Sequence, residues 1–392
     1  MMAAIFAAMS GAETMLLERT RDGGRKILIS GGGRCNILPA RVSERRFVTD
    51  SSPNTLRKVL RSWPLPQQIA FFERELGLTL IEEEESAKLF PASNRARDVR
   101  DGLLELATRR GARFFPGITI TRIAPVSDGW QVQCHGASPL RVDAVIVATG
   151  GLSVPNTGSD GRGLAMLAAL GHTIHPTYPA LTPVVADPAR FGALAGISLP
   201  VTITARDATR HANATGGFLF THRGYSGPSV LDVSHVIARS RLEGNGGARI
   251  SIRWTRLDEA GWEAALKPEA TRTVAGALRR ELPVRLVDAL ADLADVPPSK
   301  PLAQLGREER LRLIDVLVRG ELPWTGDEGY KKAEVTGGGV SLAEIDPRTM
   351  ESRRHPGLFL CGEVLDAFGP IGGYNFLWAW ATGRAAGIGA AE

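Results

Sequence analysis

Cysteine is scarce in this chain, and the few cysteines present lie far apart. The 392 residues include three, Cys35, Cys134 and Cys361. Disulfide frameworks and zinc sites need cysteines at short, regular spacings, so we expect neither of these, and no metal centre. A close cysteine pair for disulfide exchange is lacking too. Each thiol is expected to pack as a small apolar group, although Cys35 stands beside a glycine cluster, where a reactive thiol is the alternative.

Long apolar runs and aromatic side chains are also sparse. No run approaches the ~20 residues of a membrane-spanning helix. Met1–Ala12 is apolar but lacks the basic start of a secretory leader, so we expect a cytoplasmic protein. The net charge is +5 and the aromatic content 6%. The arginines are dispersed and not interleaved with aromatic residues, which argues against a nucleic-acid partner. The size and composition are those of a globular protein with two or three domains.

Glycine is abundant, with 44 residues, and one cluster lies between Gly357 and Gly387. Leu358–Cys361 is typical of a buried strand and ends at Gly362 and Glu363. Such an ending lets the backbone pass close to a sugar chain, while the carboxylate accepts a hydroxyl hydrogen bond. An apolar helix, Tyr374–Ala386, begins directly after Gly372 and Gly373, so its free N–H groups face a ligand with negative charge.

These features suit the ribityl chain and the electron-rich pyrimidine edge of a reduced flavin. Tyr374 and Asn375 are then expected at the edge of the ring. An ordinary strand, turn and core helix is the alternative interpretation, and two further segments favour the flavin.

The first of these segments is 16–36. Met15–Leu17 is typical of a short strand, and Glu18 at its end can bind the ribose hydroxyls of a dinucleotide. Successive glycines let the backbone approach a flat ligand, and Lys26 and Arg34 can neutralise phosphate or reduced flavin. A flexible surface loop is the alternative. The cofactor-binding residues expected here are Glu18, Arg25, Lys26, Ser30, Gly31, Gly32, Gly33, Arg34, Cys35 and Asn36.

The second segment is 142–163. Ala144–Val147 is a continuous apolar run, typical of a buried parallel strand. The run stops at Ala148, Thr149 and Gly150, whose small side chains permit close passage of a ligand. The three segments together predict that glycine-lined crossings, far apart in the sequence, surround one flavin.

Over nearly its whole length the chain resembles the BaiN/YhiN-type NAD(P)/FAD-dependent oxidoreductases, which are flavoproteins with two dinucleotide-binding domains. The resemblance implies an FAD enzyme with a discontinuous FAD domain and NAD(P)H as a transient co-substrate. It places Ile118 in the segment that passes the adenine, and we expect Asp366 among the cofactor-binding residues. The matching segments are Gly24–Asn36, Val145–Gly161, Gly217–Ser234, Ala333–Arg353 and Gly357–Gly387.

The family pattern differs at the start of the chain. In the family a strand, a G-x-G-x-x-G turn and a helix open the FAD domain. Met1–Met9 resembles the interior of that helix, and Glu13–Leu17 the next strand. We therefore expect the first strand and its glycines to be missing from this sequence, and an upstream in-frame stretch to encode them. A degenerate chain that does not hold FAD is the alternative.

The expected fold class is α/β, with a Rossmann-like FAD-binding domain formed by residues 1–175 and 345–392. Strand-forming residues between turns indicate an inserted β-barrel-like domain at 176–255 and 321–344. Apolar residues at three- and four-residue steps indicate a small helical bundle at 256–320.

Catalytic candidates come from Phe220–Pro228. His222 titrates near neutrality and could protonate a substrate atom opposite hydride delivery, and Tyr225 could donate to a carbonyl. Ser226, two residues before Pro228, is expected to cap a helix. Thr336–Gly339 could bring backbone N–H groups near the flavin, with a tight turn as the alternative.

The function predicted from these features is an FAD-dependent oxidoreductase. NAD(P)H would reduce FAD, which would then reduce a conjugated C=C or C=N bond of a small molecule. The alternatives are an FAD-dependent amine oxidase, an RNA-modifying flavoprotein and a truncated non-catalytic remnant.

Overall fold

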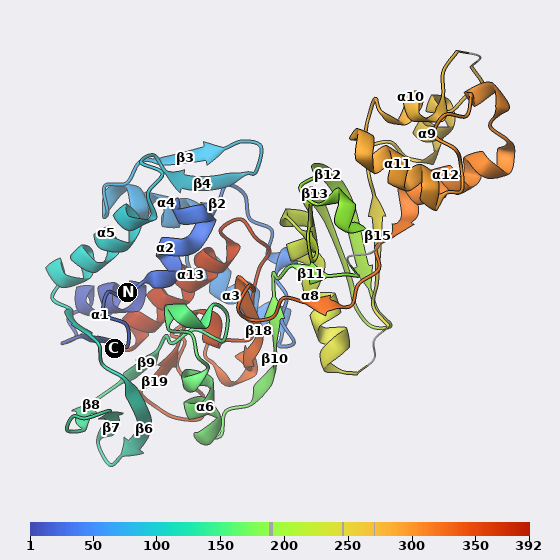
Figure 1. Ribbon diagram of the computed structural model, residues 1–392. Coiled ribbons are helices and arrows are strands. Elements are labelled where there is room, and N and C mark those ends of the chain that lie inside the picture. Colours follow the sequence, from blue (N-terminus) through green and yellow to red (C-terminus); the bar gives the residue numbers. More distant parts are fainter. Residues whose placement is uncertain (188–190, 245–246, 270) are drawn as a thin grey trace. The chain divides into compact units, whose positions relative to one another are not determined.

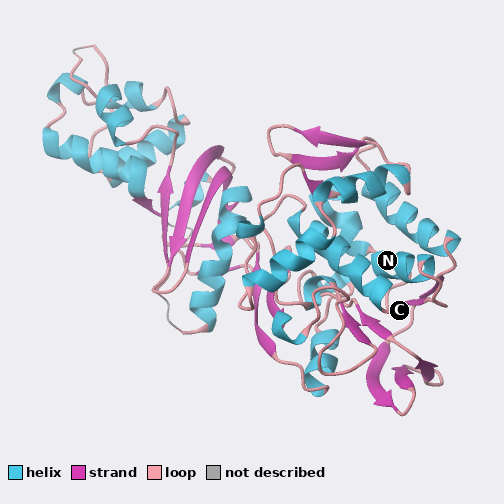
Figure 2. Cartoon of the chain, turned by 180° about the vertical axis from the view of Figure 1, so that it is seen from behind, coloured by secondary structure: helices cyan, strands magenta, loops and turns pink. Residues whose placement is uncertain are grey.

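The chain folds as two compact units. The computed structural model describes residues 1–187, 191–244, 247–269 and 271–392. Unit 1 comprises Met1–Pro179 and Glu334–Glu392, and unit 2 comprises Ala180–Ala333 (Figure 1). Helices and strands occur in both units (Figure 2), so the fold is mixed α/β, as expected. The division into three domains at the boundaries given above stays a prediction.

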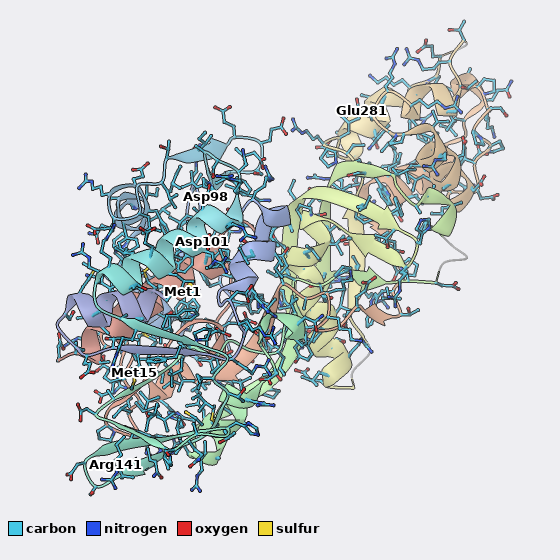
Figure 3. All side chains as sticks on the ribbon, turned by 60° about the vertical axis from the view of Figure 1, so that its left-hand side comes forward. Met1, Met15, Asp98, Asp101, Arg141 and Glu281 are labelled. Carbon is cyan, nitrogen blue, oxygen red and sulfur yellow. The ribbon has the colours of Figure 1, made fainter. Side chains whose placement is uncertain are left out.

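Unit 1 carries two parallel strand pairs, β1 with β5 and β9 with β19. Its helices are α1 (Met2–Met9), α2 (Arg25–Ile29), α3 (Pro53–Ser62), α4 (Leu65–Arg74), α5 (Ala96–Arg109), α6 (Arg162–Ala169) and α13 (Tyr374–Gly389). Its strands are β1 (Met15–Glu18), β2 (Leu38–Pro39), β3 (Leu80–Glu83), β4 (Lys88–Pro91), β5 (Arg113–Pro116), β6 (Ile120–Val126), β7 (Gly129–Cys134), β8 (Leu140–Val142), β9 (Val145–Val147), β10 (Ile174–Ala180), β18 (Val335–Val340) and β19 (Leu358–Leu360). Figure 3 labels Met1 and Met15, at the starts of α1 and β1.

The strand pairing places the predicted site segments at strand ends. β1 pairs with β5 and β19 pairs with β9, both in parallel. Glu18 ends β1, Ala148 follows β9, and Gly362 follows β19 by two residues. Ligands of α/β proteins bind outside the carboxyl ends of parallel strands, so the pairing favours the predicted location of the site.

The C-terminal helix α13 packs against α1 at very short range. A Cβ at Gly387 would lie 2.3 Å from the carbonyl oxygen of Ala3, and one at Gly383 would lie 3.1 Å from Cβ of Met2. Any larger residue at 387 would push the helices apart. Most of α13 is buried, including Trp378 and Trp380, so the core of unit 1 is built from both ends of the chain.

Unit 2 contains a seven-stranded sheet in the order β16-β15-β12-β13-β14-β11-β17. The pairings found in this sheet are antiparallel. Among the described residues the two end strands do not pair with each other, so the sheet is open where a barrel-like insert is expected. Its strands are β11 (Val184–Val185), β12 (Ser198–Arg206), β13 (His211–Thr221), β14 (Gly224–Ser226), β15 (Arg249–Arg253), β16 (Gly320–Glu321) and β17 (Gly326–Asp327).

The helices of unit 2 share one apolar core with the sheet. They are α8 (Pro228–Leu242), α9 (Glu259–Ala265), α10 (Val274–Leu278), α11 (Val284–Leu293) and α12 (Arg307–Arg319). The predicted cap at Ser226 is wrong: Ser226 ends β14, and Gly227, at φ 95°, occupies the cap position of α8 without a side-chain bond. In the ranges described above, no helix combines the length and apolar composition needed to cross a membrane.

Candidate flavin site

The three glycine-lined segments meet at Lys26. Its Nζ lies 2.5 Å from Oε2 of Glu363 and 2.5 Å from Oγ of Ser153. Ser153 Oγ in turn donates to Oε1 of Glu363, at 2.6 Å. These residues come from α2, from the segment after β9 and from the turn after β19. The predicted convergence of segments that are far apart in the sequence is therefore present in the folded chain.

Thr336 in β18 fixes the segment after β9. Its Oγ1 accepts hydrogen bonds from the backbone N–H of Leu152, at 2.7 Å, and of Ser153, at 3.1 Å. A Cβ at Gly151 would lie 2.4 Å from the same oxygen, so only glycine fits there. The backbone N–H of Thr336 donates to Oε1 of Glu363 at 3.0 Å. Thr336 thus acts mainly through its side chain, which sequence reasoning did not anticipate.

Small residues after β9 let this segment pack closely against Ser159 and α6. Gly150 has φ 70°, and a Cβ there would lie 2.8 Å from Oγ of Ser159. A Cβ at Gly163, in α6, would lie 1.8 Å from Oγ1 of Thr149. Ala148, Thr149 and Gly150 thus follow β9 directly, and the chain packs tightly against this segment.

Glu18 lies at the end of β1, as predicted. Its Oε1 accepts hydrogen bonds from the backbone N–H and the hydroxyl of Thr20, both at 2.7 Å. The N–H of Ile118 donates to the Glu18 carbonyl at 2.9 Å. Gly158 is also close to this carboxylate, because a Cβ there would lie 3.9 Å from Oε1 of Glu18. Glu18 and Ile118 are thus hydrogen-bonded neighbours, and their role at the adenosine end of the cofactor stays a prediction.

The segment before the triple glycine is helical, and this helix was not predicted from the sequence. Arg25–Ile29 forms α2 because Gly24, at φ 61°, turns the chain into it. Arg100 lies beneath this turn and donates to the carbonyls of Asp22 and Gly23, at 3.1 and 3.2 Å. Arg25 pairs with Asp22 at 2.7 Å. The helix thus carries Lys26 toward Glu363.

The triple glycine forms a short open turn. Gly31, Gly32 and Gly33 have φ values of 55°, 68° and 85°, in the left-handed region that favours glycine. A Cβ at Gly32 would meet nothing within 4 Å. The turn therefore presents bare backbone, as close approach of a flat ligand requires. Ser30 Oγ is turned back onto the Ile27 carbonyl, at 2.8 Å.

The residues after the glycines are held by the protein itself. Arg34 pairs with Glu83 at 3.0 Å, and its guanidinium lies 4.2 Å from the centre of the Phe90 ring. Cys35 is fully buried, and burial raises the pKa of its thiol to about 12. A reactive thiolate is disfavoured there, in line with the expected packing role. Asn36 donates to the Leu38 carbonyl at 3.1 Å and accepts from the Gly373 N–H at 3.0 Å.

The loop before α13 is shaped by its own side chains. Asn375 accepts from the Gly369 N–H at 2.9 Å and donates to the Gly369 carbonyl at 3.0 Å. Tyr374 is buried, and its hydroxyl donates to the Arg41 carbonyl at 3.1 Å. Gly372 and Gly373 have φ values of 99° and 87°. The glycines thus leave the helix N-terminus as bare backbone, while the two side chains expected at the ring edge fold back onto the chain.

Lys88 and Asp366 also lie near this loop. Lys88 was not anticipated, yet a Cβ at Gly372 would lie 3.5 Å from its Cε. Asp366, predicted to bind the cofactor, is buried. Its Oδ2 accepts from the N–H of Asp50 at 2.9 Å and from the N–H and hydroxyl of Ser51, both at 2.8 Å. In the structure this carboxylate holds the loop at residues 50 and 51.

The catalytic candidates belong to unit 2. His222 is exposed in the turn between β13 and β14. Tyr225 lies in β14 and is fully buried, and its hydroxyl donates to the carbonyl of Pro323 at 3.0 Å. Its ring packs 5.7 Å from that of Phe218 and 6.1 Å from that of Phe220. These contacts give Tyr225 a clear packing role.

The residues of unit 1 fit a flavin dinucleotide. Bare glycine backbone at Gly32, Gly362 and Gly372 would let the ring and ribityl chain approach, because glycine provides both the space and the positive φ values. Lys26 supplies a positive charge beside Glu363. The start of α13, a helix of 16 residues, presents free N–H groups to an electron-rich ring edge.

A family model and several known proteins match this chain over nearly its whole length. The HI0933-like protein Rossmann domain family matches residues 1–389. The ribosomal RNA dihydrouridine synthase of Escherichia coli K12 is 30% identical over 97% of this chain and 93% of its own length. The 3-dehydro-bile acid delta(4,6)-reductase of Clostridium scindens is 31% identical over 100% of this chain and 96% of its own length.

One of the solved structures that match this chain is a 3-ketosteroid-delta4-(5alpha)-dehydrogenase from Rhodococcus jostii RHA1. It is 16% identical with a TM-score of 0.47, over 100% of this chain and 94% of that chain.

Proposed function

Because the chain belongs to the HI0933-like Rossmann-domain family of FAD-binding oxidoreductases, we propose that it reduces a carbon–carbon double bond conjugated to a carbonyl group. NAD(P)H is the proposed electron donor. The observation that carries the proposal is the convergence of three glycine-lined segments at Lys26, Ser153 and Glu363. This convergence forms a frame for one flavin.

The names of two relatives support this reaction class. One is a delta(4,6)-reductase of a 3-dehydro bile acid, and the other makes dihydrouridine in ribosomal RNA. Dihydrouridine is uridine whose ring C=C, conjugated to a carbonyl, has been saturated. The two names therefore describe one chemical change on two very different molecules: a hydride and a proton add across a C=C bond. The same change is proposed for this chain.

FAD would supply the redox chemistry by taking two electrons from NAD(P)H and delivering them as hydride. The chain would hold it through Glu18 at the ribose, backbone around Gly32 and Gly362, and the N-terminus of α13 at the pyrimidine edge. Lys26 would balance negative charge on the phosphate or the ring. By filling the space around the ring, these segments would exclude water from it.

The second requirement of the reaction is a proton for the substrate carbon that does not receive hydride. We propose His222 for this role, since its imidazole is exposed and histidine is the side chain that most often transfers protons in enzymes. Tyr225 is the second proposed donor. Its hydroxyl would first have to leave the carbonyl of Pro323.

A second candidate function is reduction of uridine within RNA. It is favoured by the 30% identity to the ribosomal RNA dihydrouridine synthase, which weakens the expectation of no nucleic-acid partner. Both candidate functions saturate a C=C bond, and they differ in whether a small molecule or an RNA carries that bond. The third candidate, an amine oxidase, has no support from the named relatives.

The test is an anaerobic mixing experiment on purified protein loaded with FAD. NADH or NADPH is expected to bleach the flavin absorbance, and a conjugated enone or a uridine-containing RNA is expected to restore it. Bleaching by amines with release of peroxide in air, without bleaching by either nicotinamide, would overturn the proposal in favour of the oxidase.

A further inference from the structure

One face of the sheet in unit 2 is polar and carries arginine on two strands. Along β12, Val201, Ile203 and Ala205 are buried and join the apolar core. Side chains alternate between the faces of a strand, so the residues between these three lie on the opposite, outward face. The pairing register then assigns the neighbours of each outward residue on β13 and β15. We call this surface the outward face. Its residues are Thr202, Thr204, Arg206, His211, Asn213, Thr215, Arg249, Ser251 and Arg253.

The first row of the outward face consists of basic side chains and an imidazole. Arg206 is the direct partner of His211 on β13 and of Arg249 on β15. All three are exposed. Like charges directly opposite each other on neighbouring strands destabilise a sheet. Within the described residues, neither arginine has an ion pair with a carboxylate. An anion bound by both guanidinium groups would offset this repulsion, so the row is suited to anion binding.

The nearby acidic residues do not neutralise this row. Asp207 bonds to Arg210 at 2.8 Å. Glu243 contacts the same arginine. Glu321 on β16 is the direct partner of Ser251, so it borders the outward face and sets one carboxylate against the three arginines. The face therefore keeps a net positive charge from Arg206, Arg249 and Arg253.

The middle of the outward face offers hydroxyl and amide groups. Asn213 Nδ2 donates to Thr204 Oγ1 at 2.9 Å, and the hydroxyls of Thr202 and Thr215 lie 2.9 Å apart. Arg253 lies beyond them, four residues along β15 from Arg249, which is roughly 13 Å. Its Nε is buried and has no hydrogen-bond partner among the described residues. Arginines thus stand at both ends of a row of uncharged hydrogen-bonding groups.

We propose that the outward face binds the phosphate backbone of a folded RNA. Arginine forks match phosphate oxygens, and Ser, Thr and Asn bond to phosphate and ribose hydroxyls. The nine residues of the face include no Phe, Tyr or Trp, and His211 is their one aromatic ring, so the face lacks the series of rings on which successive bases stack in single-strand platforms. The partner is therefore helical RNA recognised by its backbone. This inference rests on the proposed function only in that the RNA would carry the uridine to be reduced.

The test measures binding of a fluorescent uridine-containing RNA hairpin to the FAD-loaded full chain across a salt series. For Arg206→Gln/Arg249→Gln we expect roughly tenfold weaker binding and a salt slope reduced by about 2. The matched control is Arg279→Gln/Arg280→Gln, which removes the same charge from the helical part of unit 2 and should leave binding nearly unchanged. Equal losses in both double variants would overturn the proposal, and so would no loss in either.

A second variant reverses the charge at position 249 and is expected to keep the sheet folded. Arg249→Glu places a carboxylate opposite Arg206, so the melting temperature should stay equal or rise while RNA binding is lost. Retained binding would contradict the proposal. Stronger binding of single-stranded poly(U) than of the hairpin would also overturn it. Loss of binding to anionic phosphatidylserine vesicles, with RNA binding intact, would identify the surface as a membrane site instead.

Flavin reduction by NADPH and turnover of a free enone should be unchanged in both outward-face variants. If the unmodified chain binds the hairpin as predicted but shows no flavin reduction, the proposed function fails and the binding surface stands. The two proposals therefore fail independently.

Discussion

Lys26 and Glu363 are 337 positions apart in the chain, yet Nζ of the lysine lies 2.5 Å from Oε2 of the glutamate. Their side chains are 28% and 17% exposed, so solvent screens this ion pair only in part. Ser153 bonds to both partners. This contact is where the three cofactor segments are joined, and several expectations depend on it.

Replacing Lys26 tests whether the joined segments hold FAD. Lys26→Met removes a charge-assisted hydrogen bond and leaves Glu363 half-buried without its cation. We expect the dissociation constant for FAD to rise about 10- to 100-fold, since such bonds contribute roughly 1.5–3 kcal/mol. Fluorescence titration of apoprotein with FAD measures it. Lys58→Met, at an exposed lysine of α3, is the matched control, and equal affinities in the two variants would contradict this role.

A methyl group at Gly151 should disturb the segment after β9. The added Cβ would lie 2.4 Å from Oγ1 of Thr336, which holds the N–H groups of Leu152 and Ser153. We expect Gly151→Ala to lower the free energy of unfolding by about 1–3 kcal/mol, measured by urea denaturation. Gly102→Ala is the control: its Cβ would meet Leu76 at 3.5 Å, and α5 should gain roughly 0.5–1 kcal/mol. Equal stabilities would refute the crowding argument.

Acid should weaken the fold through Glu344. Burial by itself would raise the pKa of this carboxyl, but hydrogen bonds from Arg354, Thr173 and His172 lower it from 4.5 to about 2. A carboxyl with a lowered pKa in the folded state stabilises the fold above its unfolded pKa. That contribution is lost as the pH falls from 4.5 toward the folded value. Glu344→Gln should therefore flatten the melting temperature against pH in this window.

The same melting curves distinguish the contribution of Glu344 from that of its neighbour His172. Burial lowers the pKa of His172 below 6.5, although Glu344 raises it, so His172 costs stability once the pH falls below its unfolded value. That slope should persist in Glu344→Gln, while Glu73→Gln, at an exposed site of α4, should leave both slopes intact. A Glu344→Gln curve identical to the parent would rule out the linkage.

The cysteines should be unreactive in the folded chain. Burial raises the pKa of Cys35 to about 12 and of Cys361 to about 11, and it also raises the pKa of Cys134. Since the thiolate is the reactive form, a thiol reagent at mildly alkaline pH should label the native protein slowly and all three cysteines after denaturation. Cys35→Ala should retain its flavin. Rapid labelling of Cys35 in the native chain would revive the reactive-thiol alternative.

His222 is tested through the second half of the reaction. If it supplies the substrate proton, His222→Asn should lower turnover of an enone about 100-fold or more, while NAD(P)H still bleaches the flavin at the parent rate. His135→Asn, at another exposed histidine, should leave both steps unchanged. Full turnover of His222→Asn would remove this residue from the mechanism.

The parts of the fold that the sequence predicts well are those with a local cause. The helix after Gly373 was expected over Tyr374–Ala386 and runs to Gly389, because an unbroken apolar run following two glycines has few other structures open to it. In contrast, α2 was missed: five residues are too few for a periodic pattern, and its start depends on Arg100 beneath the preceding turn.

Contacts between distant segments mark the limit of sequence reasoning. Ser153 looks like an ordinary loop serine until its partners, 127 and 210 residues away, are known. Asp366 was expected to bind the cofactor, and its hydrogen bonds to residues 49–51, more than 300 positions away, could not be read from the sequence. Arg206 and Arg249 appear dispersed in the sequence, and only the register of β12 and β15 makes them direct partners.

The packing of α13 on α1 has a consequence for how the chain folds as the ribosome makes it. Unit 2, residues 180–333, is a continuous stretch, and it emerges while the partner of α1 is still unmade. Gly383 and Gly387 can reach Met2 and Ala3 only after all of unit 2 has been made. Until then α1 can pack on α5 but lacks α13, so unit 1 completes its core only after unit 2 has been made.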